Sequence, residues 1–359
     1  MSSPGDMLRL ARQRLGFNQK TAAERIGIPQ PVISRIENGL SAPDSAILLR
    51  AAQVYQVPPE FFEQRDPVYG PPVSVHAMTR AKSDVTAYQL DQITAELNIR
   101  LMHLTRFLEG VDFNATANVP TLDVEQYGNP EKIAATVRAH WGVPSGPVKN
   151  LMQWVERAGV VVGFSRFGGA SVSGVTFKVP GRPPLVLLNS THPADRARFT
   201  LAHEIGHLVM HRFPTDDMET EANTFASAFL LPAAEIKQSF RGRKITLELL
   251  AALKPEWQVA MQALLMRASG LGLVSANQSR YLWQQISARG WRTSEPAELD
   301  FAKEMPTVLP SIVKAYLSDL GYSMEDLAKL ARLHESEFVE MYGVPGSSAP
   351  ARAKLQIIR

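Results

Sequence analysis

The chain has 359 residues, of which 45% are hydrophobic, and a formal net charge of +3. This length and composition predict two or three folded domains and exclude a disordered or fibrous chain. There is no cysteine, which excludes disulfides and cysteine-ligated metal sites, so histidine and carboxylate side chains must hold any metal. No secretion signal opens the sequence and no apolar run reaches membrane-spanning length, so we expect a cytoplasmic protein without membrane contacts.

Residues 1–66 are expected to form a domain of five short helices. Gly16 and Gly27 mark the ends of the first two helices, and Asn38 with Gly39 closes the third, because these residues readily adopt the left-handed backbone that ends helices. The second and third helices are short and joined by a glycine-containing turn. This arrangement predicts a helix-turn-helix.

Residues 19–28 and 32–39 resemble the DNA-binding domain of the phage-repressor (XRE) type, and the resemblance implies a double-stranded DNA operator as partner. In that family a glutamine at the start of each motif helix cooperates at the DNA, and we expect Gln30 to pair with an adenine edge in the major groove. Pro29 and Pro31 depart from the family pattern, because they replace polar residues and remove contacts there. The expected DNA-binding residues are Gln19, Gln30, Ser34, Arg35 and Asn38.

A linker rich in proline and glycine is expected over residues 67–83, followed by a helical connector over residues 84–129. In the connector, apolar residues recur every three or four positions from Leu90 to Leu108, which predicts one long amphipathic helix. Its apolar stripe either packs against the next domain or pairs with a second copy of the chain in a homodimer. Residues 111–130 are expected to form a loop.

Residues 130–243 are expected to form a domain with a small sheet and a metal site. Three short runs rich in branched residues, within 160–188, are bounded by glycine or proline and predict strands. After them, His203, Glu204 and His207 form the pattern HExxH. Histidines four positions apart project from one side of a helix, so both rings can bind one zinc ion, and Glu204 is placed to act as a proton-transfer base.

A catalytic zinc ion needs a third protein ligand, and the next expected helix supplies acidic candidates. Glu219 is the preferred ligand, with Asn223 one turn later as the amide that orients a zinc-bound histidine ring. Glu221 is the alternative ligand, because a rotation of about 200° from Glu219 prevents both from facing the metal. His211, one turn beyond His207, is a further ligand that the geometry allows, although a histidine near a helix end is more often solvated.

Residues 198–207, 219–226 and 230–232 together resemble the ImmA/IrrE family of metallopeptidases, in which the two motifs occur in this order. The resemblance implies a gluzincin-like zinc endopeptidase, with the two motif histidines and a glutamate of the second motif as ligands, Glu204 as base and a repressor-type regulator as substrate. In zinc peptidases of this design, an edge strand of the sheet pairs with extended substrate. Candidates by residue type for stabilising the oxyanion are His192, His211 and Tyr281.

Residues 244–359 are expected to be helical. Within them, residues 321–328 align without gaps on residues 16–23, which indicates either a second helix-turn-helix-like unit or a chance likeness between two helix pairs. The second helix of this unit would carry three acids, whose charges repel phosphates, so we expect it to contact protein rather than DNA. These acids are Glu335, Glu337 and Glu340.

The sequence thus predicts an α+β, mainly helical fold, with an N-terminal helix-turn-helix domain, a zincin-like domain built on a small sheet and the HExxH helix, and a helical C-terminal region. The leading functional hypothesis is a DNA-binding transcriptional regulator with a Zn2+-dependent endopeptidase domain that cleaves a repressor-type protein. The alternative is a non-proteolytic regulator whose metal-binding domain senses a metal, a peptide or a protein partner.

Overall fold

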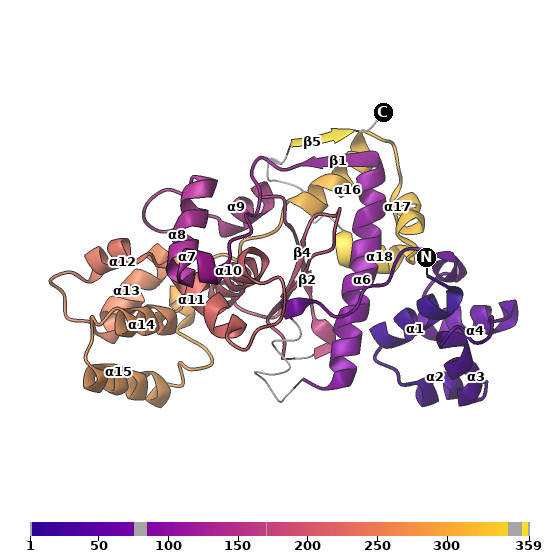
Figure 1. The fold of residues 1–359 in the computed structure, drawn as a ribbon, viewed down its shortest axis with the longest axis horizontal. Helices are drawn as coiled ribbons and strands as arrows, with labels where there is room; N and C mark the ends of the chain where they lie inside the picture. Colours follow the sequence, from indigo (N-terminus) through magenta and orange to yellow (C-terminus); the bar gives the residue numbers. More distant parts are fainter. Residues whose placement is uncertain (1, 75–84, 170, 344–353, 358–359) are drawn as a thin grey trace.

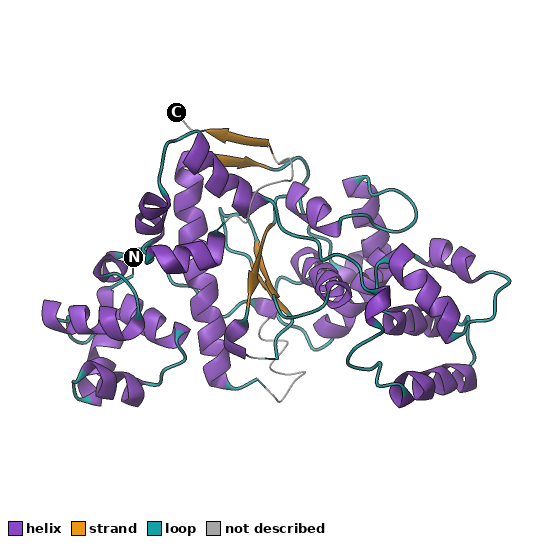
Figure 2. Cartoon of the chain, turned by 180° about the vertical axis from the view of Figure 1, so that it is seen from behind, coloured by secondary structure: helices purple, strands orange, loops and turns teal. Residues whose placement is uncertain are grey.

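Helices form most of the structure, and two small sheets complete an α+β fold (Figure 1), seen from behind in Figure 2. This computed structural model describes residues 2–74, 85–169, 171–343 and 354–357. An N-terminal helical domain lies beside a long helix, the sheet lies on the other side of that helix, and further helices extend beyond the sheet. The predicted fold class is confirmed. Across the described residues, no helix has both the length and the apolar character needed to cross a membrane.

Four α-helices and one 3-10 helix make up the N-terminal domain, as the turn signals predict. The Asn18 side chain accepts a backbone N–H in the first turn of the second helix, and Gly27 ends that helix with a φ of 73°. A side chain larger than hydrogen is disfavoured at such a positive φ, which explains the glycine. The elements are α1 (Pro4–Arg14), α2 (Gln19–Ile26), α3 (Gln30–Glu37), α4 (Ser45–Tyr55) and η1 (Pro59–Glu63).

One helix of 24 residues, α6 (Ala87–Gly110), runs through the middle of the molecule. One side of α6, including Ile93 and Leu97, packs into the core that contains the sheet and the C-terminal helices. Another side, including Ala95 and Ile99, packs into the core of the N-terminal domain. The apolar stripe of the connector is therefore buried inside its own chain, which agrees with the packing interpretation and leaves the stripe unavailable for a dimer.

The larger sheet has the strand order β2–β4–β3, in which β2 runs parallel and β3 antiparallel to β4. Val175 of β3 pairs with Leu187 of β4. Because side chains alternate along a strand, Leu185 and Leu187 enter the core shared with α6, whereas Val186 enters the core on the opposite face. The strands are β2 (Val161–Ser165), β3 (Gly174–Phe177) and β4 (Leu185–Asn189), close to the three predicted runs.

The other helices cover the faces of this sheet and extend beyond it. The metal-motif helix α10 (Ala194–Met210) and its partner α11 (Met218–Leu230) lie on the face opposite to α6. The remaining helices are α7 (Val124–Tyr127), α8 (Pro130–Trp141), α9 (Leu151–Arg157), η2 (Phe167–Gly169), α12 (Ala233–Phe240), α13 (Leu247–Trp257), α14 (Met261–Gly270), α15 (Ala276–Ala288), η3 (Ala297–Leu299), α16 (Val308–Ser318), α17 (Met324–Ala331) and α18 (Glu335–Tyr342).

Two strands lie where the sequence does not predict them. β1 (Val111–Asn114) follows α6 in a segment expected to be a loop, and β5 (Lys354–Ile357) lies in a region expected to be helical. They pair antiparallel, with Val111 opposite Ile357. The expectation of a loop over all of 111–130 is wrong, because this pairing joins segments far apart in sequence and no local pattern signals it.

The C-terminal likeness to the helix-turn-helix recurs in the structure. Helices α17 and α18 each have eight residues and are separated by three residues. Helices α2 and α3 have the same lengths and the same separation. The acidic second helix contacts the N-terminal domain, because the Arg14 guanidinium forms an ion pair with Glu337. The expectation that the unit contacts protein rather than DNA stays a prediction.

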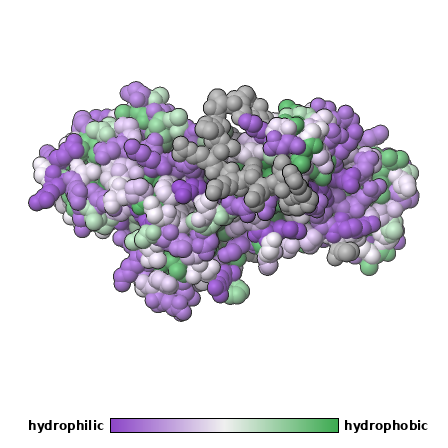
Figure 3. Space-filling view, turned by 90° about the horizontal axis from the view of Figure 1, so that it is seen from above, coloured by the Kyte–Doolittle hydropathy of each residue, from purple (hydrophilic) through white to green (hydrophobic). Residues whose placement is uncertain are grey.

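The molecular surface seen from above is mainly hydrophilic, with hydrophobic residues in small groups (Figure 3). Such scattered apolar residues are normal for a folded protein in water.

Candidate metal centre

Helix α10 places the three residues of the HExxH pattern in a buried layer between the sheet and α11. His203 and His207 are 9% and 3% exposed, and Glu204 is fully buried. Gly206 makes this packing close, because a Cβ atom there would lie 3.2 Å from the Phe225 ring and 3.3 Å from Ala222 of α11. The glycine therefore lets α11 approach the motif helix.

Helix α11 brings Glu219 to the two histidines. The Nε2 atoms of His203 and His207 lie 3.0 Å apart, and the Glu219 carboxylate lies 3.1 Å from His207 Nε2 and 3.7 Å from His203 Nε2. All three ligand atoms lie within 4.8 Å of one another. Ligands of a tetrahedral zinc ion at about 2.0–2.1 Å lie about 3.3 Å from each other. The donor types and their spacing therefore fit zinc.

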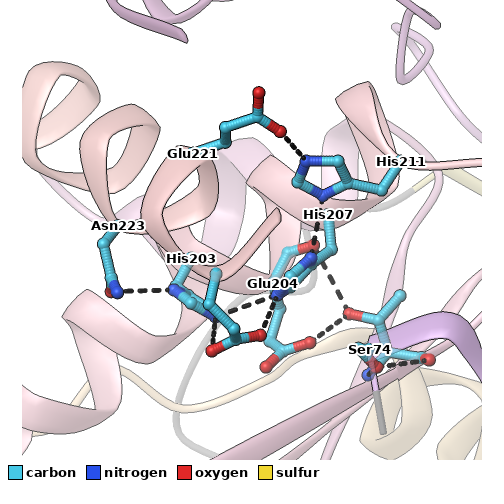
Figure 4. A network of polar contacts seen from close by, with 9 residues as sticks. Ser74, His203, Glu204, His207, His211, Glu221 and Asn223 are labelled. Atoms are coloured by element: carbon cyan, nitrogen blue, oxygen red, sulfur yellow. Dashed lines mark hydrogen bonds and ion pairs between the residues drawn. The ribbon is translucent and has the colours of Figure 1, made fainter. Parts of the chain in front are cut away.

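A hydrogen bond behind His203 leaves its Nε2 lone pair available for a metal. Its Nδ1 lies 3.0 Å from Asn223 Oδ1 (Figure 4). Because an amide oxygen only accepts, His203 must carry its proton on Nδ1, and Nε2 then carries the lone pair that a metal would bind. The structure thus places Asn223 next to one of the two motif histidines.

A longer chain of hydrogen bonds lies behind His207. His207 Nδ1 lies 2.9 Å from His211 Nδ1, and His211 Nε2 lies 3.0 Å from a Glu221 carboxylate oxygen. Burial, reinforced by His207, lowers the pKa of His211 to about 3, so its ring is neutral at pH 7. Glu221 then accepts from His211 Nε2–H, His211 Nδ1 accepts from His207 Nδ1–H, and His207 Nε2 keeps its lone pair.

This arrangement separates the two acidic candidates. Glu219 faces the histidine Nε2 atoms. Glu221 instead contacts His211 (Figure 4). Neither Glu221 nor His211 belongs to the group of described residues whose ligand atoms meet.

Glu204 lies beside the same centre with one carboxylate oxygen held and the other free to act. Thr176 of β3 donates its hydroxyl to Glu204 Oε2 at 2.6 Å. Glu204 Oε1 is buried and has no hydrogen-bond partner among the described residues. Burial raises the pKa of Glu204, partly offset by His207 and the Thr176 hydroxyl. Sequence reasoning did not identify Thr176, because a threonine on a distant strand carries no motif.

The candidates for an oxyanion-stabilising residue are dispersed. His211 belongs to the hydrogen-bond chain behind His207. Tyr281 is 58% exposed on α15, at an end of the molecule away from the sheet. His192 lies in the turn between β4 and α10.

The expected DNA-contacting residues lie on α2, on α3 and at the C-terminal cap of α3. Helix α3 is on the side of the N-terminal domain away from α6 (Figure 1). Gln30 donates to the Gln19 side chain at 2.8 Å, and Gln19 donates to Glu37 at 2.9 Å. Glu37 is buried and paired with Arg12 at 2.6 Å, so this chain of contacts anchors the two glutamines. The Asn38 side chain donates to the Ser34 hydroxyl at 3.4 Å, and Arg35 is exposed.

Comparison with known proteins agrees with this two-part design. Residues 8–62 match a helix-turn-helix family model, and residues 155–269 match a peptidase family model described as the IrrE N-terminal-like domain. Over 66 residues the chain is 35% identical to the HTH-type transcriptional regulator ImmR of Bacillus subtilis (strain 168), a match that covers 18% of this chain. The chain spans about half the length of that curated relative, 52%. The matches therefore indicate a chain in which a helix-turn-helix domain is joined to an IrrE-like domain.

Proposed function

We propose that this chain is a DNA-binding transcriptional regulator whose IrrE-like domain is a zinc-dependent endopeptidase. The observation that carries the proposal is the meeting of two imidazole nitrogens and one carboxylate within 4.8 Å, beside a buried glutamate. Three such ligands leave a fourth position open, which is the arrangement of catalytic rather than structural zinc sites.

His203, His207 and Glu219 would hold the metal. When bound, zinc would polarise the substrate carbonyl and make a water molecule more acidic. Glu204 Oε1 would take the proton from the attacking water, while Thr176 keeps Oε2 in place at 2.6 Å. Because burial raises the pKa of Glu204, its protonated form is stabilised, and the same carboxyl would pass the proton to the leaving amine.

The N-terminal domain supplies the regulatory half of the proposal. Gln30 and Arg35 would reach base edges in the major groove, Gln19 would support Gln30, and Ser34 with Asn38 would contact the DNA backbone. A repressor-type protein is the proposed substrate, because the chain matches a helix-turn-helix family model and is similar over 66 residues to a protein described as an HTH-type transcriptional regulator.

The test is to incubate the purified full-length chain with candidate repressors of the helix-turn-helix type, and separately by itself. Each reaction is run with and without a zinc chelator, beside Glu204→Gln. We expect cleavage that the chelator and Glu204→Gln both abolish. If no candidate and no copy of the chain is cleaved, the non-proteolytic regulator becomes the better account.

A further inference from the structure

Residues 66–74, which follow the N-terminal domain, contact both α6 and strand β3 of the metallo-domain. Asp66 pairs with Arg106 of α6 at 2.6 Å. The Asn98 side chain, also on α6, accepts the Tyr69 backbone N–H at 2.7 Å and donates to the Tyr69 carbonyl at 2.9 Å. The Tyr69 ring also packs edge-on against Phe177 of β3, with centroids 6.1 Å apart. This part of the linker is therefore held in one course along α6 toward β3.

Ser74, the last residue described in this segment, lies at the outer edge of β3. β3 is an edge strand, because β4 covers only one of its sides. On the other side, Ser74 Oγ lies 3.3 Å from the Thr176 carbonyl oxygen and 3.3 Å from the Thr176 amide nitrogen. The hydroxyl thus donates to the C=O and accepts from the N–H of one residue. A residue of an added strand would make these same two bonds with its own backbone.

The outer edge of β3 lies next to the metal centre. Thr176 donates its side-chain hydroxyl to Glu204 at 2.6 Å while its backbone contacts Ser74. Ser74 and Glu204 are therefore close together (Figure 4). An extended peptide that used the Thr176 backbone would therefore run past the base and the three ligands. Ser74 is 2% exposed, so the contact is shielded from competing water.

We propose that residues 66–74 occupy the substrate-binding edge of the metallo-domain and compete with the peptide that this edge binds. The inference rests on the proposed function, and names the regulation of the same site. A tethered segment competes at a high effective concentration, so peptides gain access mainly when Tyr69 and Ser74 leave the strand. The occupant of the edge is thus either the chain's own linker or an extended substrate peptide.

The first arm of the test is cleavage and amide exchange in the full-length chain. Ser74→Ala removes the bridging hydroxyl, and Ser294→Ala, in an exposed loop, is the matched control. We expect Ser74→Ala to raise kcat/KM by about two- to tenfold, the value of one or two net hydrogen bonds. Hydrogen exchange of the β3 segment should become faster in Ser74→Ala and stay unchanged in Ser294→Ala. Unchanged hydrogen exchange of β3 in Ser74→Ala would overturn the inference. If the wild type cleaves its substrate, faster exchange in Ser74→Ala without a higher kcat/KM would also overturn it.

The second arm needs no cleavage. A fluorescent, capped synthetic peptide of residues 66–74 is added to full-length Glu204→Gln and to Glu204→Gln carrying Tyr69→Ala and Ser74→Ala. We expect binding only to the second protein, because its own linker no longer holds the edge. Failure of the peptide to bind there refutes the inference. If the peptide binds but no protein is ever cleaved, the endopeptidase function fails and the occupied edge stands.

Discussion

The hydrogen bonds behind the two histidines predict that zinc affinity depends on residues that do not touch the metal. Asn223→Ala removes the acceptor 3.0 Å from His203 Nδ1. Glu221→Leu removes the acceptor 3.0 Å from His211 Nε2. The His211 proton is then no longer held on Nε2, so His211 Nδ1 is not fixed as the acceptor for His207. Each histidine can then place its proton on Nε2, the atom that must bind zinc. Losing such a partner weakens metal binding by about 10–100-fold, or about 1.4–2.7 kcal/mol.

The assay is zinc competition between a chromophoric chelator and the purified full-length chain at pH 7.5. Glu221→Gln separates charge from hydrogen bonding, because its amide oxygen still accepts from His211, and we expect it to lose less affinity than Glu221→Leu. Glu248→Gln, at an exposed acid on α13, is the control and should match the wild type. Wild-type affinity in both Asn223→Ala and Glu221→Leu would refute the reasoning that the outer hydrogen bonds fix the tautomers.

Three further predictions concern stability and DNA binding. Burial and the nearby Arg100 charge lower the pKa of His103 well below 6.5. As the pH falls, the unfolded chain therefore takes up this proton before the folded chain does. At pH values below about 6.5, the free energy of unfolding should decrease by up to about 1.4 kcal/mol for each pH unit. Urea unfolding at pH 7.5 and 5.5 measures this decrease, which should be smaller in His103→Gln than in the wild type. An equal decrease in the two proteins would contradict the prediction. Gly206→Val should destabilise the metal-free chain by about 1–3 kcal/mol through overpacking against Phe225, measured by the same unfolding with chelator; unchanged stability would count against the close approach of α11. Gln30→Ala should weaken binding to an operator selected from random DNA by about 1–3 kcal/mol and relax the preference at one base pair, measured by fluorescence anisotropy; a uniform loss across sequences would mean that Gln30 contacts only the backbone.

Local periodicity explains which parts of the site the sequence could predict. The spacing of His203 and His207, and that of Glu219 and Asn223, each spans one helical turn, so a single helix fixes which side chains share a face. The same argument separated Glu219 from Glu221, and in the structure these two glutamates face different histidines. The helix-turn-helix was predictable for a similar reason, since glycine positions mark the helix ends.

Contacts between distant segments explain what the sequence could not reveal. Ser74 and Thr176 are 102 residues apart, and Thr176 and Glu204 are 28 apart on a strand and a helix. No period or motif links such residues, because their meeting depends on how the linker, sheet and helix pack together. The pairing of β1 with β5 has the same origin. His211 and Glu221 were each recognised as candidate ligands, but their pairing with each other depends on the close packing of α10 and α11.

The most direct test of the central claim is a zinc titration of metal-stripped protein, with cleavage and bound metal measured in the same samples. In the wild type, cleavage of the identified substrate should rise and reach a plateau at one zinc per chain. Glu204→Gln should bind the same single equivalent and cleave at least about 100-fold more slowly, because only the proton-transfer base is lost. Cleavage by the metal-free chain, or wild-type cleavage by Glu204→Gln, would contradict the account.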